Sequence, residues 1–278
     1  MQRIVQDLRR RKKTIGFVPT MGALHTGHLS LIKQACKEND IVIVSIFVNP
    51  AQFGSGEDFR RYPRNLKVDA LLCRNEGVDF IFYPDAADVY PKGYKTYVIV
   101  EQLSDVLCGK FRPGHFKGVA TIVTKLFNIV QPDIAYFGQK DAQQAVIIQQ
   151  MVKDLNMSLK IKVLPIIREP DGLAMSSRNA YLSEQERKDA AVLHQALRKA
   201  QDLIKRGTTN PSKIILAMRR IIRRKESARI QYIEIVDPDE LKPVKKIKDR
   251  VLIALAVYVG KTRLIDNLII NSNIKNTN

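Results

Sequence analysis

The amino-acid sequence predicts an α/β protein: a Rossmann-like, doubly wound parallel sheet followed by a smaller C-terminal α+β domain. Between residues 14 and 165, short runs rich in Val, Ile and Phe alternate with segments of helical periodicity, which is typical of βαβ units. The run at 41–48 is apolar almost throughout, as expected of a central strand covered on both faces. The pattern changes after the turn sequence at 170–172, so we expect domains at residues 1–170 and 171–278.

The individual elements follow from the same periodicities. We expect strands of the first domain at residues 14–18, 41–48, 78–83, 133–137 and 159–164. Apolar residues at helical spacing predict helices around Leu29, Ile32 and Cys36, over 119–130, and over 142–154. The second domain should contain helices at 184–205 and 211–226 and strands near 230–236 and 251–259. Because ligands of such sheets bind at the carboxyl ends of the strands, functional residues should lie there.

Composition restricts the class of protein. The chain has 278 residues, 45% of them hydrophobic and 27% charged, with no uninterrupted apolar run of the roughly 18 residues that a membrane helix needs. The first residues lack the apolar stretch of a secretory signal. Three widely spaced cysteines without a CxxC pair indicate free thiols in a reducing compartment. We therefore expect a soluble cytoplasmic protein without a membrane partner.

The net charge of +18 leaves two interpretations open. Basic proteins attract phosphate-bearing partners, which include nucleotides and nucleic acids. Much of the charge lies in the run 9–13 and in the cluster Arg219, Arg220, Arg223, Arg224 and Lys225. In a helix, positions 219, 220, 223 and 224 share one face, so this cluster is either a phosphate-tracking stripe or a solvated surface. A nucleic-acid-binding protein is therefore the alternative from another class, and we rank it below an enzyme.

A pair of histidines follows the first predicted strand. His25 and His28 stand three residues apart where a helix is expected to begin, so they project onto the same side. A helix N-terminus favours anions, and two imidazole donors could neutralise charge that builds on a phosphate. Gly27 removes a side chain that would block close approach of a nucleotide. This turn predicts a nucleotide-phosphate site.

Two further segments carry groups suited to phosphate. Gly138, Gln139, Lys140 and Asp141 form a βα turn in which the lysine can reach phosphates and the acid can cap the helix. The segment Met175-Ser176-Ser177-Arg178, at the domain junction, offers two hydroxyls and a guanidinium suited to pyrophosphate oxygens. Neither a dinucleotide-binding glycine motif nor a P-loop is present in the sequence.

The His-x-Gly-His turn and the Met-Ser-Ser-Arg segment resemble those of the nucleotidyltransferase superfamily. Over nearly its whole length the chain is similar to the pantoate–β-alanine ligases, also called pantothenate synthetases. The strings that carry this resemblance are VPTMGALHTGH, SIFVNPAQF, YPR at 62–64, RPGHFKGVATIV, FGQKDAQQ, REPDGLAMSSRN and VGKTRLIDN.

The resemblance implies a two-step ligation that uses ATP. Pantoate carboxylate attacks the α-phosphate and releases pyrophosphate; the amine of β-alanine then opens the pantoyl-adenylate, giving pantothenate and AMP. The implied catalytic residues are His28, at the proton-donating position, with His25, Lys140 and Arg178. The implied ATP contacts are Met21, Gly22, Ala23, Leu24, His25, Thr26, Gly27, His28, Gly138, Gln139, Lys140, Asp141, the Ile167 backbone, Met175, Ser176, Ser177 and Arg178.

The resemblance also implies the remaining ligands. Gln52 and Gln144 match the positions that hold pantoate, and an amide that both donates and accepts suits a polyhydroxylated acid. Mg²⁺ is expected with ATP, and Asp69 matches an acidic position near the family's metal site. The family further implies a homodimer and a hinged smaller domain that closes Ser176 and Arg178 over ATP. An adenylyltransferase that stops at a nucleotide-bearing product remains the second alternative.

Overall fold

The computed structural model describes residues 1–271, which form two compact units. The first comprises Met1–Gln139 and Gln144–Pro165, and the second comprises Lys140–Gln143 and the chain from Ile166 onward. The end of the predicted second domain, residues 272–278, lies outside the described residues. The roles assigned to the two predicted domains remain predictions.

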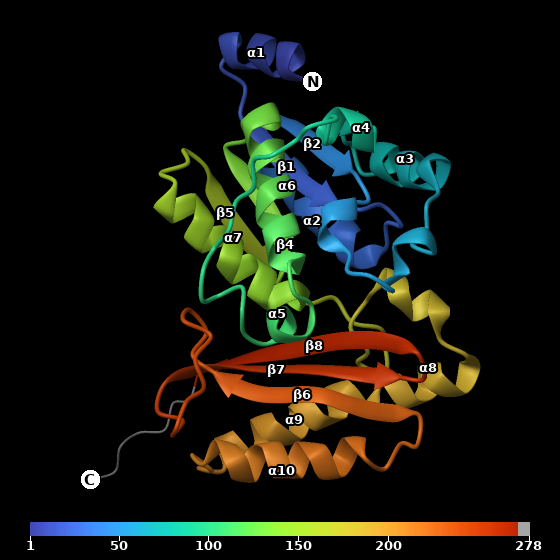
Figure 1. The fold of residues 1–278 in the computed structure, drawn as a ribbon, viewed down its shortest axis with the longest axis vertical. Helices are drawn as coiled ribbons and strands as arrows, with labels where there is room; N and C mark the ends of the chain where they lie inside the picture. Colours follow the sequence, from blue (N-terminus) through green and yellow to red (C-terminus); the bar gives the residue numbers. More distant parts are fainter. Residues whose placement is uncertain (272–278) are drawn as a thin grey trace. The chain divides into compact units, whose positions relative to one another are not determined.

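A five-stranded parallel sheet forms the centre of the first unit (Figure 1). Its strand order is β3-β2-β1-β4-β5, and the strands are β1 (Ile15–Thr20), β2 (Ile41–Ile46), β3 (Phe80–Phe82), β4 (Ile134–Gly138) and β5 (Lys160–Leu164). Parallel pairing runs from Ile15↔Ile41 to Thr20↔Ile46 between β1 and β2. The doubly wound sheet and all five strands predicted for it are confirmed.

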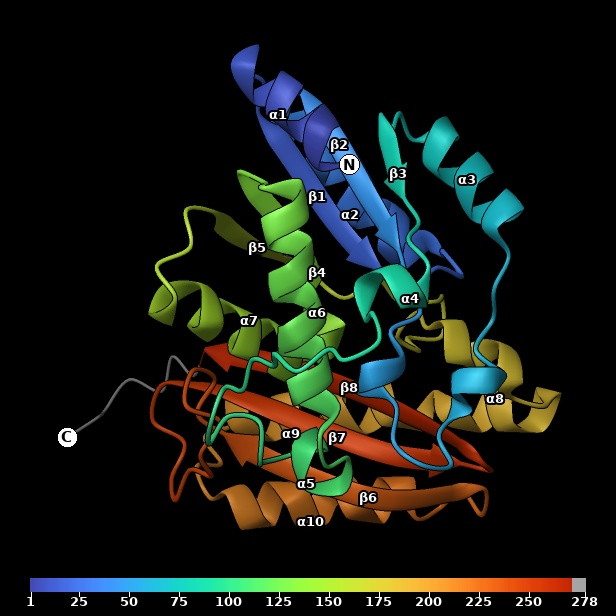
Figure 2. The ribbon, with the colours of Figure 1, turned by 45° about the horizontal axis from the view of Figure 1, so that its top comes forward.

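Helices cover both faces of this sheet, with α2 and α6 on opposite faces (Figures 1 and 2). The helices of this part of the chain are α1 (Gln2–Arg10), α2 (Thr26–Glu38), α3 (Leu66–Asn75), α4 (Ala86–Val89), α5 (Cys108–Phe111), α6 (His115–Val130) and α7 (Ala142–Asp154). Short 3₁₀ turns lie at η1 (Pro50–Gln52), η2 (Asp58–Arg60) and η3 (Gln139–Asp141). Helices on both faces explain why β2 is apolar except at Ser45: residues 42–46 are all buried.

Helix α1 was not predicted, because its arginines dominate the sequence there. It is amphipathic: Val5 and Leu8 are buried, and the Arg9 guanidinium lies 2.9 Å from the Asp133 carboxylate. Part of the basic run at 9–13 therefore belongs to a packed helix.

The second unit is a three-stranded antiparallel sheet covered on one face by two helices (Figure 2). Its elements are η4 (Ser177–Tyr181), α8 (Glu184–Ala190), α9 (Val192–Lys205), α10 (Pro211–Ile222), β6 (Ala228–Val236), β7 (Arg250–Val259) and β8 (Thr262–Asn271). This confirms the smaller α+β domain. The single helix predicted over 184–205 is two helices, which divide at Ala191. Strand β8 was not predicted.

The second basic cluster does not lie along one helix, so the interpretation as a stripe on one helical face is not supported. Helix α10 ends at Ile222, so Arg223 is its C-cap and Arg224 and Lys225 follow the helix. Cations there interact favourably with the helix dipole. Lys225 also pairs with Asp189 at 3.0 Å.

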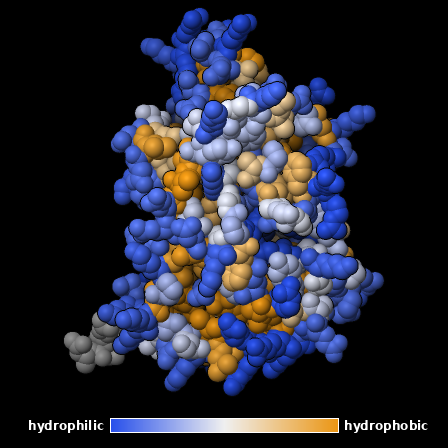
Figure 3. Space-filling view, in the orientation of Figure 1, coloured by the Kyte–Doolittle hydropathy of each residue, from blue (hydrophilic) through white to orange (hydrophobic). Residues whose placement is uncertain are grey.

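The outer surface agrees with the high proportion of charged residues. The space-filling view shows mostly hydrophilic side chains on the visible face, with smaller apolar areas between them (Figure 3). Within residues 1–271, no helix combines the length and the apolar character that crossing a membrane would require.

Gly118 in α6 allows this helix to touch η1. A Cβ at Gly118 would lie 2.2 Å from the Ala51 carbonyl oxygen and 2.7 Å from the Gln52 nitrogen, both of them backbone atoms. Substituting Gly118→Ala should therefore displace η1 and destabilise the protein by about 1–3 kcal/mol. Thermal unfolding should show the loss. The control is Gly138→Ala, where a Cβ would meet no atom within 4 Å; equal effects of both changes would contradict the prediction.

Candidate active site

The segments predicted to be functional in the first unit begin at the carboxyl ends of parallel strands. Residues 21–28 follow β1, residues 49–53 follow β2, and a turn begins at Gly138, the last residue of β4. The strand order reverses direction between β1 and β4, which makes this the topological switch point of the sheet. Ligands of open α/β sheets bind at such a point.

The turn between β1 and α2 has an unusual backbone. Gly22 (φ 79°) and Ala23 (φ 50°) are both in the left-handed region, which is uncommon for alanine. The Asp69 carboxylate, on α3, accepts hydrogen bonds from the Ala23 and Leu24 amides at 3.0 and 2.8 Å. A Cβ on Gly22 would lie 2.8 Å from an oxygen of the same carboxylate. Both this close approach and the positive φ therefore favour glycine at position 22. Asp69 therefore holds the turn that leads into α2.

The two histidines form a reciprocal cap at the N-terminus of α2. His25 is the N-cap residue, and its Nδ1 accepts from the Gly27 amide at 3.1 Å. The Nδ1 of His28 accepts from the His25 amide at 3.3 Å, and the ring centroids are 4.1 Å apart. Because each Nδ1 accepts a hydrogen bond, each neutral ring carries its proton on Nε2. Both imidazoles are thus held as Nε2–H donors at a helix N-terminus.

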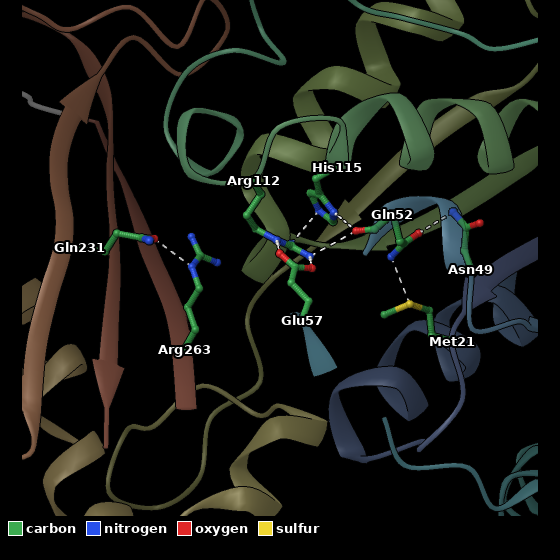
Figure 4. A network of polar contacts seen from close by, with 8 residues as sticks. All are labelled: Met21, Asn49, Gln52, Glu57, Arg112, His115, Gln231 and Arg263. Carbon is green, nitrogen blue, oxygen red and sulfur yellow. Dashed lines mark hydrogen bonds and ion pairs between the residues drawn. The ribbon is translucent and has the colours of Figure 1, made fainter. Parts of the chain in front are cut away.

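Gln52, predicted to bind pantoate, has a fixed side chain (Figure 4). It is 9% exposed, its Oε1 accepts from Asn49 Nδ2 at 3.0 Å, and its Nε2 lies 3.1 Å from the Met21 sulfur. Asn49 is itself held by the Gly118 carbonyl at 3.1 Å and the Tyr90 hydroxyl at 2.8 Å. The amide orientation of Gln52 is therefore set before any ligand binds.

A second network holds the backbone of Gln52 (Figure 4). Its carbonyl accepts from Arg112 at 3.3 Å and lies 2.7 Å from His115 Nδ1. Arg112 forms a bidentate ion pair with Glu57, at 2.7 and 2.6 Å. Burial opposes ionisation of Glu57, but the Arg112 guanidinium outweighs it and holds the pKa of this carboxyl below its ordinary value.

The sequence alone indicates no role for Glu57, Arg112 or His115. Arg112 and His115 lie in the string RPGHFKG, which was used only for the resemblance. An arginine and a histidine directly before a helix could have indicated a polar site. Their partner Glu57 is 55 residues from Arg112, so only the fold identifies the pair.

In the second unit, the predicted residues lie on two segments. Lys140 and Asp141 end η3, and Met175–Arg178 leads into η4, whose N-cap Ser176 accepts from the Arg178 amide at 3.3 Å. The residues from 175 to 178 are partly exposed, and Ile167 is 36% exposed. Gln144, on α7 in the first unit, is also half-buried. Figure 4 includes one more pair of this second unit, Arg263 donating to Gln231 at 2.9 Å.

The carboxylate of Asp69, the predicted metal ligand, is already hydrogen-bonded within the protein. It is 2% exposed, and each of its carboxylate oxygens is occupied by a backbone amide. Across residues 1–271, no group of three or more His, Cys, Asp or Glu side chains is arranged to hold a metal ion. Mg²⁺ commonly keeps several waters and substrate phosphates as ligands, so a site made by protein groups alone is not required.

A doubly wound parallel sheet with a histidine-capped helix at its switch point is the architecture of an α/β enzyme that binds ligands at the carboxyl ends of its strands. The family model for pantoate-β-alanine ligase matches residues 1–269, and the chain belongs to this family of ligases of pantothenate biosynthesis.

Curated relatives agree with this assignment. The pantothenate synthetase of Caldicellulosiruptor saccharolyticus is 57% identical over 270 residues, covering 97% of this chain and 96% of the relative. That of Fervidobacterium nodosum is 57% identical over 271 residues, covering 98% and 96%.

Solved structures show the same fold. Pantothenate synthetase from Thermus thermophilus superimposes with a TM-score of 0.91 at 44% identity, covering 95% of this chain and 96% of that one. Pantoate-β-alanine ligase from Francisella tularensis, complexed with β-γ ATP and β-alanine, gives a TM-score of 0.79 at 39% identity, covering 96% and 95%.

Asp69→Asn tests the anchoring of the β1–α2 turn. Asparagine keeps the size but offers one acceptor where two amides need partners, so we expect about 2 kcal/mol lower stability. In ¹⁵N NMR spectra, His25 and His28 should lose their single Nε2–H tautomer. The control is Asp79→Asn, since Asp79 accepts from the Val42 amide at 2.8 Å at the opposite end of the sheet. Unchanged histidine spectra in Asp69→Asn would refute the anchoring role.

Proposed function

We propose that this enzyme joins pantoate to β-alanine through a pantoyl-adenylate. A pantoate carboxylate oxygen attacks the α-phosphorus of ATP, and the bond to the β-phosphate breaks to release pyrophosphate. The β-alanine amine then attacks the acyl carbon, the acyl–oxygen bond breaks, AMP leaves, and the nitrogen loses a proton as the amide forms. The paired-histidine cap in a member of this family is the observation on which the proposal rests.

The histidines act on the phosphates. We propose that the Nε2–H groups of His25 and His28 donate to phosphate oxygens as charge moves onto the pyrophosphate. The N-terminus of α2 adds its positive end at the same place. No covalent enzyme intermediate is needed, so positioning and charge stabilisation supply the catalysis.

Residues of several separate segments are proposed to contact ATP. Lys140 and Arg178 neutralise phosphate charge, while Ser176 and Ser177 donate hydroxyl hydrogen bonds. The Ile167 backbone and the segments 21–28 and 138–141 complete this set. The Ala23 and Leu24 amides already donate to Asp69. We therefore propose that these two residues contact ATP by van der Waals packing and that their amides do not bind its phosphates.

Gln52 and Gln144 are proposed to bind pantoate through its hydroxyl and carboxylate groups. The orientation of Gln52 supports this role, because its Oε1 already accepts from Asn49 while its Nε2 lies against a weak acceptor, the Met21 sulfur. A buried amide of fixed orientation discriminates against analogues that lack the matching hydroxyl.

Mg²⁺ is proposed to accompany ATP, with phosphate oxygens and water as its principal ligands. When bound it would neutralise the triphosphate. Asp69 supports the site indirectly, through the turn that it anchors.

The β-alanine substrate is proposed from the Francisella tularensis relative, whose structure is described as a complex with this amino acid. We also propose a cytoplasmic homodimer whose smaller domain closes over ATP. The cysteine pattern of the sequence, in which Cys36, Cys73 and Cys108 are widely spaced and form no CxxC pair, supports a reducing compartment.

Lys140→Ala and His28→Ala should each slow pantoate-dependent ATP–pyrophosphate exchange by about 10²-fold or more, because each removes a donor to the reacting phosphates. The matched control is Lys153→Ala, an exposed lysine on α7. Circular dichroism should show all three variants folded. Wild-type exchange rates in both site variants would contradict their assigned roles.

The nucleotide product separates ligation from adenylyl transfer. With pantoate, ATP and β-alanine, we expect AMP and pantothenate in equal amounts, measured by chromatography. A stable adenylylated product that persists after β-alanine is added would instead support an adenylyltransferase.

A further inference from the structure

Strand β8 contains two adjacent buried polar residues, Asp266 and Asn267, which are 2% and 3% exposed. They belong to the string VGKTRLIDN, which carries part of the family resemblance, and the sequence alone indicates no role for either residue. Burying a carboxylate or an amide is unfavourable unless it is hydrogen-bonded. Their partners therefore indicate what the two residues are for.

Asp266 binds the guanidinium of Arg168 with both oxygens. The two contacts are 2.7 and 2.9 Å long, and the Asp266 side chain is 1% exposed. Arg168 also donates to the Gly172 carbonyl at 2.9 Å. A bidentate pair of this kind fixes both distance and orientation. Asp266 thus holds the base of the segment that starts at Ile167.

This segment is a small hairpin that leads to the Met-Ser-Ser-Arg residues. Arg168 and Ala174 form an antiparallel bridge, and the Met175 amide donates to the Ile167 carbonyl at 3.0 Å. Ile167 and Met175 are therefore paired across the hairpin. Fixing Arg168 consequently fixes the start of the segment that carries Ser176 and Arg178.

Asn267 holds the other nucleotide segment of this unit. Its Nδ2 donates to the backbone carbonyl of Lys140 at 3.0 Å, although the two residues are 127 positions apart. The bond acts on the main chain, so it sets where the lysine side chain starts without engaging its ammonium group. Lys140 lies in η3, a three-residue 3₁₀ turn, and the hydrogen-bond geometry of such turns is poorer than that of an α-helix.

We propose that Asp266 and Asn267 are positioning residues for ATP. As neighbours on one strand, they set the spacing between Lys140 and the hairpin that ends in Met175–Arg178. The inference rests on the proposed function, because it assumes that both segments bind the same nucleotide. Neither residue contacts the substrate in this account, and both act through the backbone or through Arg168.

The decisive variant is Asn267→Ala, measured by pantoate-dependent ATP–pyrophosphate exchange. Loss of the hydrogen bond to Lys140 should raise the KM for ATP about fivefold and leave the KM for pantoate unchanged. The matched control is Asn271→Ala, an exposed asparagine at the end of the same strand, which should leave both constants unchanged. A purely structural role would lower the fraction of active enzyme, and hence kcat, with both KM values intact.

Asp266→Asn provides a second, independent variant if Asn267→Ala does not fold, as judged by circular dichroism. It keeps one acceptor for Arg168 and should also raise the KM for ATP selectively. Unchanged KM values for ATP in the folded variants, or equal increases for ATP and pantoate, would overturn the inference. Absence of exchange in the wild-type enzyme would instead refute the proposed function.

Discussion

The buried carboxylate of Asp69 is the constraint on which the first half of the site depends. Two consecutive residues, Gly22 and Ala23, adopt left-handed conformations, and the amides of Ala23 and Leu24 point to this carboxylate. A non-glycine residue adopts such a conformation only when its surroundings compensate the strain. The turn then delivers the chain to His25 as an N-cap, so the histidine pair depends on an acid from a different helix.

The same principle recurs at the other segments proposed to bind substrates. Loops that follow parallel strands have few ladder hydrogen bonds, so their backbone groups need other partners. Arg112 and His115 meet the carbonyl of Gln52, and Asn267 meets that of Lys140. In each case a buried or half-buried polar side chain holds a loop, and the residue proposed to contact substrate is the one held.

This division of labour separates two kinds of residue. Histidines, lysine and glutamines at strand ends have functional groups suited to phosphates and hydroxyls, so their chemistry is evident from residue type and position. The holding residues have ordinary roles in sequence terms: Glu57 looks like a solvated acid in a polar loop, and Asn267 interrupts an apolar strand pattern. Their importance depends on contacts that span tens of residues or more along the chain.

Periodicity also explains which elements were predictable. The five parallel strands and the helix over 142–154 have recognisable apolar patterns, and all are present. Helix α1 was missed because arginines mask its two buried residues, Val5 and Leu8. Strand β8 was missed because the polar residues Asp266 and Asn267 interrupt its apolar pattern. Their burial is tolerated because Asp266 pairs with Arg168 and Asn267 donates to the Lys140 carbonyl.

The sequence by itself determined the fold class, the family and the chemical groups available to the proposed site, because these depend on local periodicity and on short motifs. Only the tertiary structure decided that the Asp69 carboxylate anchors the β1–α2 turn, and that Asp266 and Asn267 hold two separate segments. The physical reason is that hydrogen-bond partners of buried polar groups are chosen by the fold. The spacing of residues along the chain does not reveal these partners. Burial of a polar group is tolerated only when the group has such a hydrogen-bond partner.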